Sequence, residues 1–266
     1  MEDFFKLEKD GGVAWLILNR PEKRNAMTWE FFTELAERFR NLDEDPEIRS
    51  VVIRAEGKMF TAGLDLVAAG SLLGGGNAFD REEFRKKVLV LQAGINAVER
   101  CRKPVIAASH GHCLGGGVDL LSACDIRLAS RDAVFSIRET RIGIVADLGT
   151  LQRLPTIIGH GWSRELALTG RDFTAAEALQ IGFITHLAED RESLIAEASR
   201  LAEEIAGLPP LTVQGVKDAL LYSRDNGVYP GLAYVSQKNA ALIPSEDMME
   251  AVAAFLEKRK PVFKGR

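Results

Sequence analysis

The stretch HGHCLGGGVDLLSACDIRLASRDAVFSIRETRIGIVADLGTLQ, residues 110–152, holds three consecutive glycines and three acids in an apolar background. The acids are Asp119, Glu139 and Asp147. A carboxyl group among apolar side chains has a raised proton affinity, which suits proton transfer near neutral pH. A glycine-rich turn that enters a helix leaves backbone N–H groups unpaired, so it can bind an anion. The stretch therefore predicts a reaction centre in which carboxyl groups stand beside oxyanion donors.

Strand and helix patterns alternate before this stretch. Val13–Leu18, residues 51–53 and residues 104–108 are short apolar runs that predict strands, and the last of them leads directly into the glycines. Thr28 is placed to cap a helix that continues to about Leu42. This β-α-β order is typical of an α/β protein with parallel strand pairing.

The segment 67–80 is rich in glycine and alanine, and two interpretations of it stay open: a mobile loop over a site, or a surface excursion. A helix is predicted over residues 81–101, because apolar side chains recur there at helical spacing. These side chains are Phe84, Val88, Leu91, Ile95 and Val98.

Beyond residue 152 the pattern becomes helical. Thr174 and Glu177 match a capping box, and helices are predicted over residues 193–206, 213–223 and 245–258. We therefore expect two parts, an α/β core over residues 1–190 and a helical region over residues 191–266. The second part is too apolar to stand by itself, so we expect it to pack on the core or on another subunit.

The composition limits the choice of partners and compartment. A net charge of −4 without a Lys/Arg stripe argues against nucleic acid, and no apolar run approaches the roughly 20 residues of a membrane span. The N-terminus lacks the features of a signal peptide, and the histidines lack metal-site spacing, so we expect a cytoplasmic protein without a metal. The cysteines Cys101, Cys113 and Cys124 predict reduced thiols, and we favour buried structural thiols over a catalytic one.

Five segments together resemble the crotonase (enoyl-CoA hydratase/isomerase) superfamily over essentially the whole chain. They are NRPEKRNAM (19–27), MFTAGLDL (59–66), HGHCLGGGVDLLSACDIRLAS (110–130), TAAEALQIGFI (174–184) and FLEKRKPVFKG (255–265). The resemblance implies a spiral of ββα repeats with a helical C-terminal region that trimerises, giving a homotrimer or a hexamer. It also implies an acyl-CoA thioester substrate and no separate cofactor, since coenzyme A is part of the substrate.

The same resemblance assigns binding positions. The thioester oxygen would accept hydrogen bonds from the backbone N–H groups of Leu64 and Gly116, and such preorganised donors stabilise the enolate that forms in the reaction. Positions implied to bind CoA are Arg24, Ala26, Ala62, Asp65 and Leu66, although Arg24 could also be an ordinary surface charge. Lys258 or Lys264 could reach the CoA bound to a neighbouring subunit.

The acid at position 147 suggests a particular branch of the superfamily. Hydratases of the superfamily have glutamates at the positions of Asp119 and Glu139, and usually glycine where this chain has Asp147. The sequences RIGIVADLGTLQRLP (141–155) and LLYSRDNGV (220–228) resemble the dienoyl-CoA isomerase branch, which converts 3,5-dienoyl-CoA to 2,4-dienoyl-CoA in fatty acid β-oxidation. This implies that Asp147 removes a proton from C2 and that Glu139 protonates C6. Asp119 would orient or polarise the group near the oxyanion site.

Three alternatives stay open. Asp147 could instead cap the helix that starts near residues 148–150, which would leave Asp119 and Glu139 as the pair of a hydratase. The protein could be a non-catalytic acyl-CoA binder, although the three acids and both oxyanion turns argue against it. Thioester hydrolase or dehalogenase chemistry ranks lower, because the acids fit proton transfer without an added nucleophile.

Overall fold

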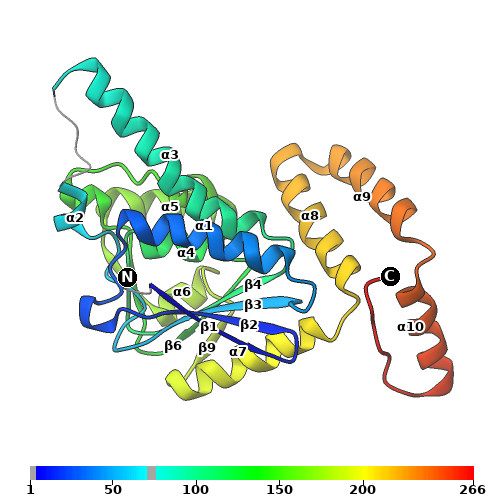
Figure 1. Ribbon diagram of the computed structural model, residues 1–266. Coiled ribbons are helices and arrows are strands. Elements are labelled where there is room, and N and C mark those ends of the chain that lie inside the picture. The colour runs from blue at the N-terminus through cyan, green and yellow to red at the C-terminus, as the bar shows by residue number, and fades with distance from the viewer. Residues whose placement is uncertain (1–3, 71–75) are drawn as a thin grey trace.

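The computed structural model describes residues 4–70 and 76–266, and a six-stranded sheet forms its centre (Figure 1). Its strand order is β1-β2-β3-β4-β6-β9, with β1 and β2 antiparallel and all later neighbours parallel. The strands are β1 (Phe5–Asp10), β2 (Val13–Leu18), β3 (Ser50–Ala55), β4 (Val105–Ser109), β6 (Ile126–Ser130) and β9 (His186–Ala188). Strand β1 was not predicted, because its sequence FKLEKD is largely polar, as suits a half-exposed edge strand.

Helices cover both faces of this sheet. Helices α1 (Trp29–Glu44) and α3 (Ala78–Arg100) pack on one face, and α7 (Arg191–Ala206) packs on the other. Side chains along a strand alternate between the two faces, so in β3 Ile53 contributes to the core under α1 while Val52 contacts the α7 side. Burial on both faces explains why the parallel strands are continuous apolar runs in the sequence.

A second, three-stranded sheet gives the chain its spiral course. It consists of β5 (His112–Leu114), β7 (Val134–Ser136) and β8 (Asp172–Thr174), in that order. The chain passes from β4 to β5 and then into α4 (Gly116–Ala123). It next passes from β6 to β7 and then into the short 3₁₀ helix η2 (Glu139–Ile142) and α5 (Thr150–Thr169). Each pass is a ββα turn, so the predicted α/β spiral is confirmed.

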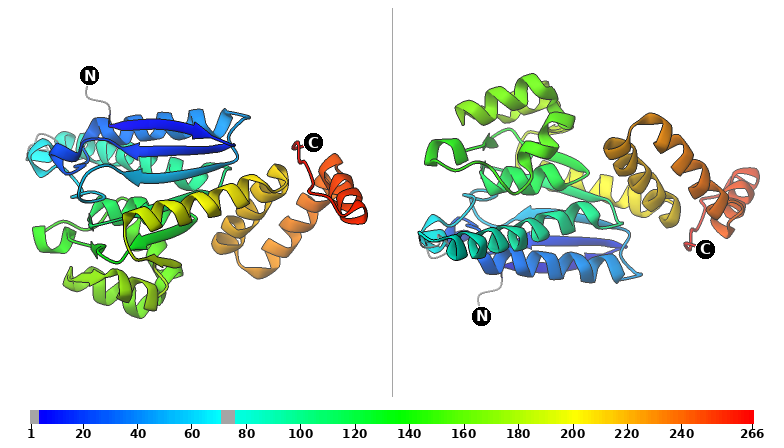
Figure 2. Two further views of the ribbon diagram at one scale, coloured as in Figure 1. Left: turned by 90° about the horizontal axis from the view of Figure 1, so that it is seen from below. Right: turned by 90° about the horizontal axis from the view of Figure 1, so that it is seen from above.

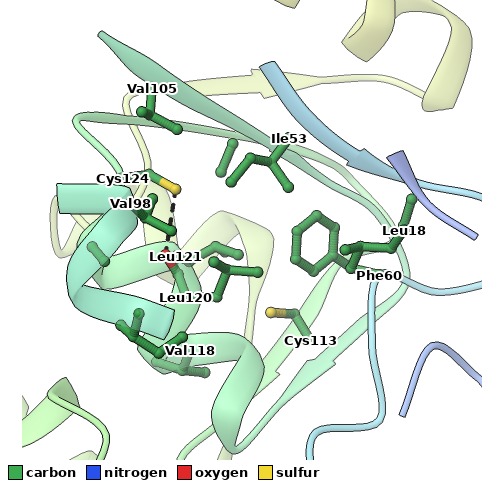
Figure 3. Close-up of a cluster of buried hydrophobic side chains, with 14 of the residues drawn as sticks. Leu18, Ile53, Phe60, Val98, Val105, Cys113, Val118, Leu120, Leu121 and Cys124 are labelled. Atoms are coloured by element: carbon green, nitrogen blue, oxygen red, sulfur yellow. Dashed lines mark hydrogen bonds between the residues drawn. The ribbon is translucent and has the colours of Figure 1, made fainter. Parts of the chain in front are cut away.

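Helix α4 is buried along its entire length, and an apolar cluster surrounds it (Figure 3). Phe60 and Cys113 lie on one side of the cluster, and Cys124 donates its S–H to the carbonyl oxygen of Leu120 at 3.3 Å. All three cysteines are buried and free, and burial raises the pKa of Cys101 to about 11 and that of Cys124 to about 12. The prediction of buried, free thiols is confirmed, and the raised pKa disfavours a nucleophilic role.

Helix α3 differs from its prediction at the N-terminal end. It begins at Ala78, three residues earlier than expected, where the Asn77 side chain accepts a hydrogen bond from the Asp80 N–H. The predicted core stripe is correct for Leu91, Ile95 and Val98, but Phe84 is 37% exposed and Val88 lies outside the core. The reason is that the first turns of α3 project beyond α1 (Figure 1).

The segment predicted as a loop over residues 67–80 is partly helical. Helix α2 (Leu66–Gly70) occupies its beginning, and α3 starts at Ala78. Residues 71–75 lie outside the described residues, so the choice between a mobile loop and a surface excursion stays a prediction there.

The last helices form an arm beside the main body (Figure 2). They are α8 (Pro210–Asn226), α9 (Val228–Leu242) and α10 (Glu246–Glu257), which follow the α/β part after α7. Helix α9 was not predicted. The predicted caps nearby are present, since Ser245 accepts a hydrogen bond from the Met248 N–H and Thr174 caps α6 (Ala175–Gln180). Within the described ranges, no helix is long and apolar enough to cross a membrane.

Candidate active site

Two turns that are far apart in sequence are joined by backbone hydrogen bonds. Thr61 pairs with the edge of β5, since its N–H donates to the His112 carbonyl (3.0 Å) and its carbonyl accepts from the Leu114 N–H (3.2 Å). The Thr61 hydroxyl donates to the Asn25 carbonyl (2.7 Å) and accepts from the Gly63 N–H (3.0 Å). The FTAGLDL turn and the glycine turn therefore hold a fixed position relative to each other.

This pairing brings the predicted oxyanion donors together. Gly63 has a φ of 85°, and a Cβ atom there would lie 2.6 Å from the Leu114 carbonyl oxygen and 3.5 Å from the Gly116 nitrogen. A Cβ atom on Gly116 would lie 4.0 Å from the Leu64 nitrogen. Within residues 4–70 and 76–266, neither the Leu64 N–H nor the Gly116 N–H donates a hydrogen bond. Two free N–H groups, one of them at the start of the buried helix α4, form a suitable site for a developing negative charge.

Glu139 lies directly against the glycine turn. Gly115 has a φ of 51°, and a Cβ atom there would come within 3.1 Å of Glu139 Oε1. The Oε2 atom is buried and accepts no hydrogen bond from any described residue. Burial, followed by the nearby charge of Asp119, raises the pKa of Glu139 from 4.5 to about 7. A large fraction of Glu139 is therefore protonated at neutral pH, as a proton donor requires.

Asp119 lies in different surroundings from the other two acids. It is 1% exposed, and its Oδ1 atom accepts a hydrogen bond from the Thr150 N–H at 2.7 Å. Thr150 is the first residue of α5, so Asp119 caps this helix from another part of the chain. Burial raises the pKa of Asp119 to about 6, while the hydrogen bonds from Thr150 act in the opposite direction.

Asp147 lies in the turn before α5, and its side chain is exposed. Its backbone carbonyl accepts a hydrogen bond from Gln92 Nε2 of α3 at 2.7 Å. The alternative in which Asp147 caps α5 is wrong, because Gly149 is the N-cap residue and the Thr150 N–H bonds to Asp119. The charge of Asp147 contributes to the raised pKa of both Asp119 and Glu139, so the three acids form one cluster. Partial desolvation raises the pKa of Asp147 itself.

An ion pair that the sequence did not reveal holds this turn in place. Arg153 is buried, and its guanidinium donates to Glu99 of α3 (Nε to Oε1, 2.9 Å) and to Asn96 Oδ1 (2.7 Å). Gly149 has a φ of 122°, and a Cβ atom there would collide with Arg153 Nη1. A lone arginine in an amphipathic helix is usually a solvated side chain, so its sequence context gave no sign of this role.

The five predicted CoA positions lie on two adjacent segments. The Ala62 N–H donates to the Arg24 carbonyl (3.0 Å), and the Asp65 N–H donates to the Met27 carbonyl (2.9 Å). Arg24 is exposed with a φ of 55°, Ala26 is half-buried, and Leu66 begins α2 with 53% of its surface exposed.

Lys258 and Lys264 lie on the C-terminal arm, at the opposite end of the subunit from α2 (Figure 1). Neither lysine is therefore near the predicted CoA segments of its own subunit. In the described part of the chain, no three His, Cys, Asp or Glu side chains are grouped to hold a metal ion.

The fold is a spiral of ββα turns, and two free N–H groups lie beside a cluster of carboxyl groups. Sequence comparison identifies the class of protein that has these features. Residues 8–266 match the model of the enoyl-CoA hydratase/isomerase family, and the chain belongs to this family. The resemblance found in the sequence is thereby confirmed.

Individual relatives show which members of the family the chain is similar to. The peroxisomal Delta(3,5)-Delta(2,4)-dienoyl-CoA isomerase of Arabidopsis thaliana is 44% identical, over 99% of this chain and 98% of its own. The mitochondrial enzyme of the same name from Homo sapiens is 44% identical, over 93% of this chain and 77% of its own. Among solved structures, an enoyl-CoA hydratase from Bacillus anthracis superposes with a TM-score of 0.92 at 32% identity, covering 99% of this chain and 100% of that one.

Proposed function

We propose that the protein isomerises 3,5-dienoyl-CoA to 2,4-dienoyl-CoA in fatty acid β-oxidation. The observation that carries this proposal is a third acid in the cluster, Asp147, whose side chain makes no helix cap and is free to accept a proton. The names of the relatives that are 44% identical support the same activity.

The proposed mechanism uses two carboxyl groups and two backbone donors. The Leu64 and Gly116 N–H groups bind the thioester oxygen, which makes the C2 protons acidic. Asp147 takes one C2 proton, and the electrons spread through the diene to give an extended dienolate. Glu139 then gives its proton to C6, so the double bonds move from C3 and C5 to C2 and C4. At the start of each turnover Asp147 must be ionised and Glu139 protonated, a division that different surroundings can impose.

We assign Asp119 a positioning role in this mechanism. Its carboxylate already accepts the Thr150 N–H, so it holds the start of α5 and the turn that carries Asp147. Its charge also raises the pKa of Glu139, which keeps the proton donor loaded. This refines the expectation that Asp119 orients groups near the oxyanion site.

Substrate binding and assembly complete the proposal. We assign CoA binding to the backbone segments that carry Arg24, Ala26, Ala62, Asp65 and Leu66. The arm of α8, α9 and α10 is assigned to trimerisation, with a hexamer as a dimer of trimers, and Lys258 or Lys264 to the CoA of a neighbouring subunit. A cytoplasmic location remains our prediction, although the names of two relatives place those proteins in peroxisomes and mitochondria.

A spectrophotometric assay tests the proposed reaction. Purified protein is given a 3,5-dienoyl-CoA and, separately, a trans-2-enoyl-CoA. We expect the absorbance of the conjugated 2,4-dienoyl thioester to grow with the first, much faster than any hydration of the second.

The second candidate function is hydration of trans-2-enoyl-CoA. It is favoured by Asp119 and Glu139, which occupy the positions of the hydratase pair, and by the structural match to an enoyl-CoA hydratase. Loss of enoyl absorbance with the second substrate and no reaction of the first would establish hydratase activity. A protein that binds acyl-CoA but is inactive in both assays would be a non-catalytic binder.

A further inference from the structure

A chamber of about 590 Å³ opens beside Asp147, on the side formed by α3, α5 and the end of α8. Asp147 is the one acid of the proposed catalytic cluster that lines it, since Asp119 and Glu139 are not among its lining residues. Asp147 therefore stands at the boundary between the reacting cluster and this chamber.

The wall of the chamber suits water better than an acyl chain. Five of its eleven lining residues are charged: Glu99, Asp147, Arg153, Arg224 and Asp225. Most of these charges are already paired, since Glu99 accepts from both Arg153 (2.9 Å) and Arg224 (2.6 Å), and Arg224 also pairs with Asp225. An apolar tail would desolvate these groups at a cost, and an anion would find no unpaired arginine among them. Water needs only about 30 Å³ per molecule and bonds to such a surface without penalty.

The proposed reaction creates a need for such a chamber. After one turnover Asp147 carries the proton taken from C2, and Glu139 has lost its proton to C6. Before the next turnover Asp147 must lose a proton and Glu139 must gain one. The substrate contributes no net proton, so the exchange occurs either directly between the acids or through water.

We propose that this chamber is the hydrated exit through which Asp147 returns its proton to solvent between turnovers. The O–H bond of protonated Asp147 breaks, a chamber water takes the proton, and solvent supplies a different proton to the Glu139 carboxylate. Gln152 and Thr156 lie exposed on the α5 wall and offer polar groups to these waters. This inference rests on the proposed isomerase function.

An isotope experiment with the whole enzyme tests the route. A 3,5-dienoyl-CoA that is deuterated at C2 is converted in ordinary water, and the label at C6 of the product is measured by mass spectrometry and NMR. Exit through the chamber predicts that the hydrogen added at C6 comes almost entirely from solvent, so that almost no deuterium appears there. Direct transfer between the acids predicts that deuterium from C2 appears at C6, and that result would overturn the proposal.

Substitutions in the wall make the test specific to this chamber. In the double variant Gln152→Leu/Thr156→Leu we expect severalfold more deuterium at C6 and a lower kcat, with the rate of a single turnover within about twofold of the wild type. The matched control is Gln180→Leu, which changes an exposed glutamine at the end of α6, outside the chamber, and should behave as wild type. Equal loss of label in the double variant and the wild type would assign the exit elsewhere.

These outcomes are distinct from failure of the proposed function. If the wild type forms no 2,4-dienoyl-CoA, the isomerase proposal itself is wrong. If it isomerises but carries the C2 label to C6, the isomerase proposal stands and the chamber route is wrong. The wild-type experiment decides this point even if the variants do not fold.

Discussion

Glu139 and Asp147 are eight residues apart in the sequence, yet their surroundings differ. Glu139 lies against Gly115, and its buried Oε2 atom accepts no hydrogen bond from the described residues, so burial favours its protonated form. Partial desolvation raises the pKa of Asp147 as well, but its side chain is exposed beside the polar chamber, where water can solvate the ionised form. Two carboxyl groups whose environments separate their proton affinities can act as acid and base in one reaction.

Replacing Asp147 by Asn should remove the proposed base without disturbing the fold. The side chain is exposed and caps no helix, so the melting temperature should change little. We expect kcat for 3,5-dienoyl-CoA to fall about 10²–10⁴-fold, the usual contribution of a general base. Steady-state assays and thermal unfolding of both proteins measure the two effects. Full activity of Asp147→Asn would exclude this residue as the base.

The pH dependence of the reaction should report the acid cluster. Glu139 must be protonated to donate, and its pKa is about 7, so kcat/KM should fall as the pH rises through about 7. Asp147 must be ionised to accept, so activity should also fall at acidic pH. Because the acids interact, the two limbs belong to the cluster as a whole. In the variant Glu139→Gln the limb near pH 7 should disappear together with most activity, and its persistence would assign that limb to another group.

At the scale of elements, contacts of helix α5 with α3 and α4 position the site. Helix α5 begins at Thr150 without a capping side chain of its own, and buried Asp119 of α4 supplies the missing acceptor. Arg153, one turn further along α5, is tied to Glu99 of α3. The turn that carries Asp147 is thus held from α3 and α4, so its geometry depends on the packing of three helices.

Substitutions of Asp119 should separate what its helix cap contributes to stability from what its buried charge contributes. Alanine removes the acceptor of the Thr150 N–H, so Asp119→Ala should be less stable than Asp119→Asn by about 1–3 kcal/mol. Asparagine keeps an acceptor oxygen without a buried charge. The pKa of Asp119 is raised from 3.8 to about 6 in the fold, so the wild type loses stability as the pH rises through this interval.

The free energy of unfolding of Asp119→Asn should therefore exceed that of the wild type above about pH 6. Below about pH 4 it should not exceed it. Urea unfolding at pH 4, 6 and 8 measures these differences. Identical unfolding of the alanine and asparagine variants would show that the cap contributes nothing.

At the scale of the whole molecule, the arm leaves much apolar surface uncovered. Phe255 is 83% exposed, and further large apolar side chains of α8, α9 and α10 are exposed as well: Leu220, Tyr229, Leu232, Met249 and Leu256. An apolar surface of this kind is typical of a subunit interface, because an isolated protein gains nothing from exposing it. Ion pairs tie α8 to the core, Lys217 with Asp125 and Arg224 with Glu99, and they leave these side chains open.

Light scattering should therefore show an oligomer. One subunit has a mass of 29.2 kDa, so a trimer has about 88 kDa and a hexamer twice that. Phe255→Asp should shift the mass toward that of the subunit, because a charge would be buried in the interface. Leu168→Asp changes a similarly exposed side chain on α5, outside the arm, and should keep the trimer. A monomeric wild type would remove the basis for the trimer proposal.

The sequence by itself determined the fold class, the family and the two glycine turns. Each of these depends on neighbouring residues: apolar runs for the buried strands, capping residues at helix starts, and glycines where a Cβ atom has no room, as at Gly63. Local sequence patterns gave wrong predictions where the burial of a segment differed from the burial that its pattern indicates. Strand β1 is too polar for a strand pattern, and Phe84 continues an apolar stripe that projects beyond the core.

Only the tertiary structure showed how the surroundings of the three acids differ. Asp119 and Thr150 are 31 residues apart, and Arg153 and Glu99 are 54 apart, so no local pattern relates them. Their pairing depends on how α3, α4 and α5 pack, and burial and neighbouring charges then set each pKa. The sequence supplied three carboxyl groups, and the packing made one a helix cap, raised the pKa of another to about 7 and left the third exposed.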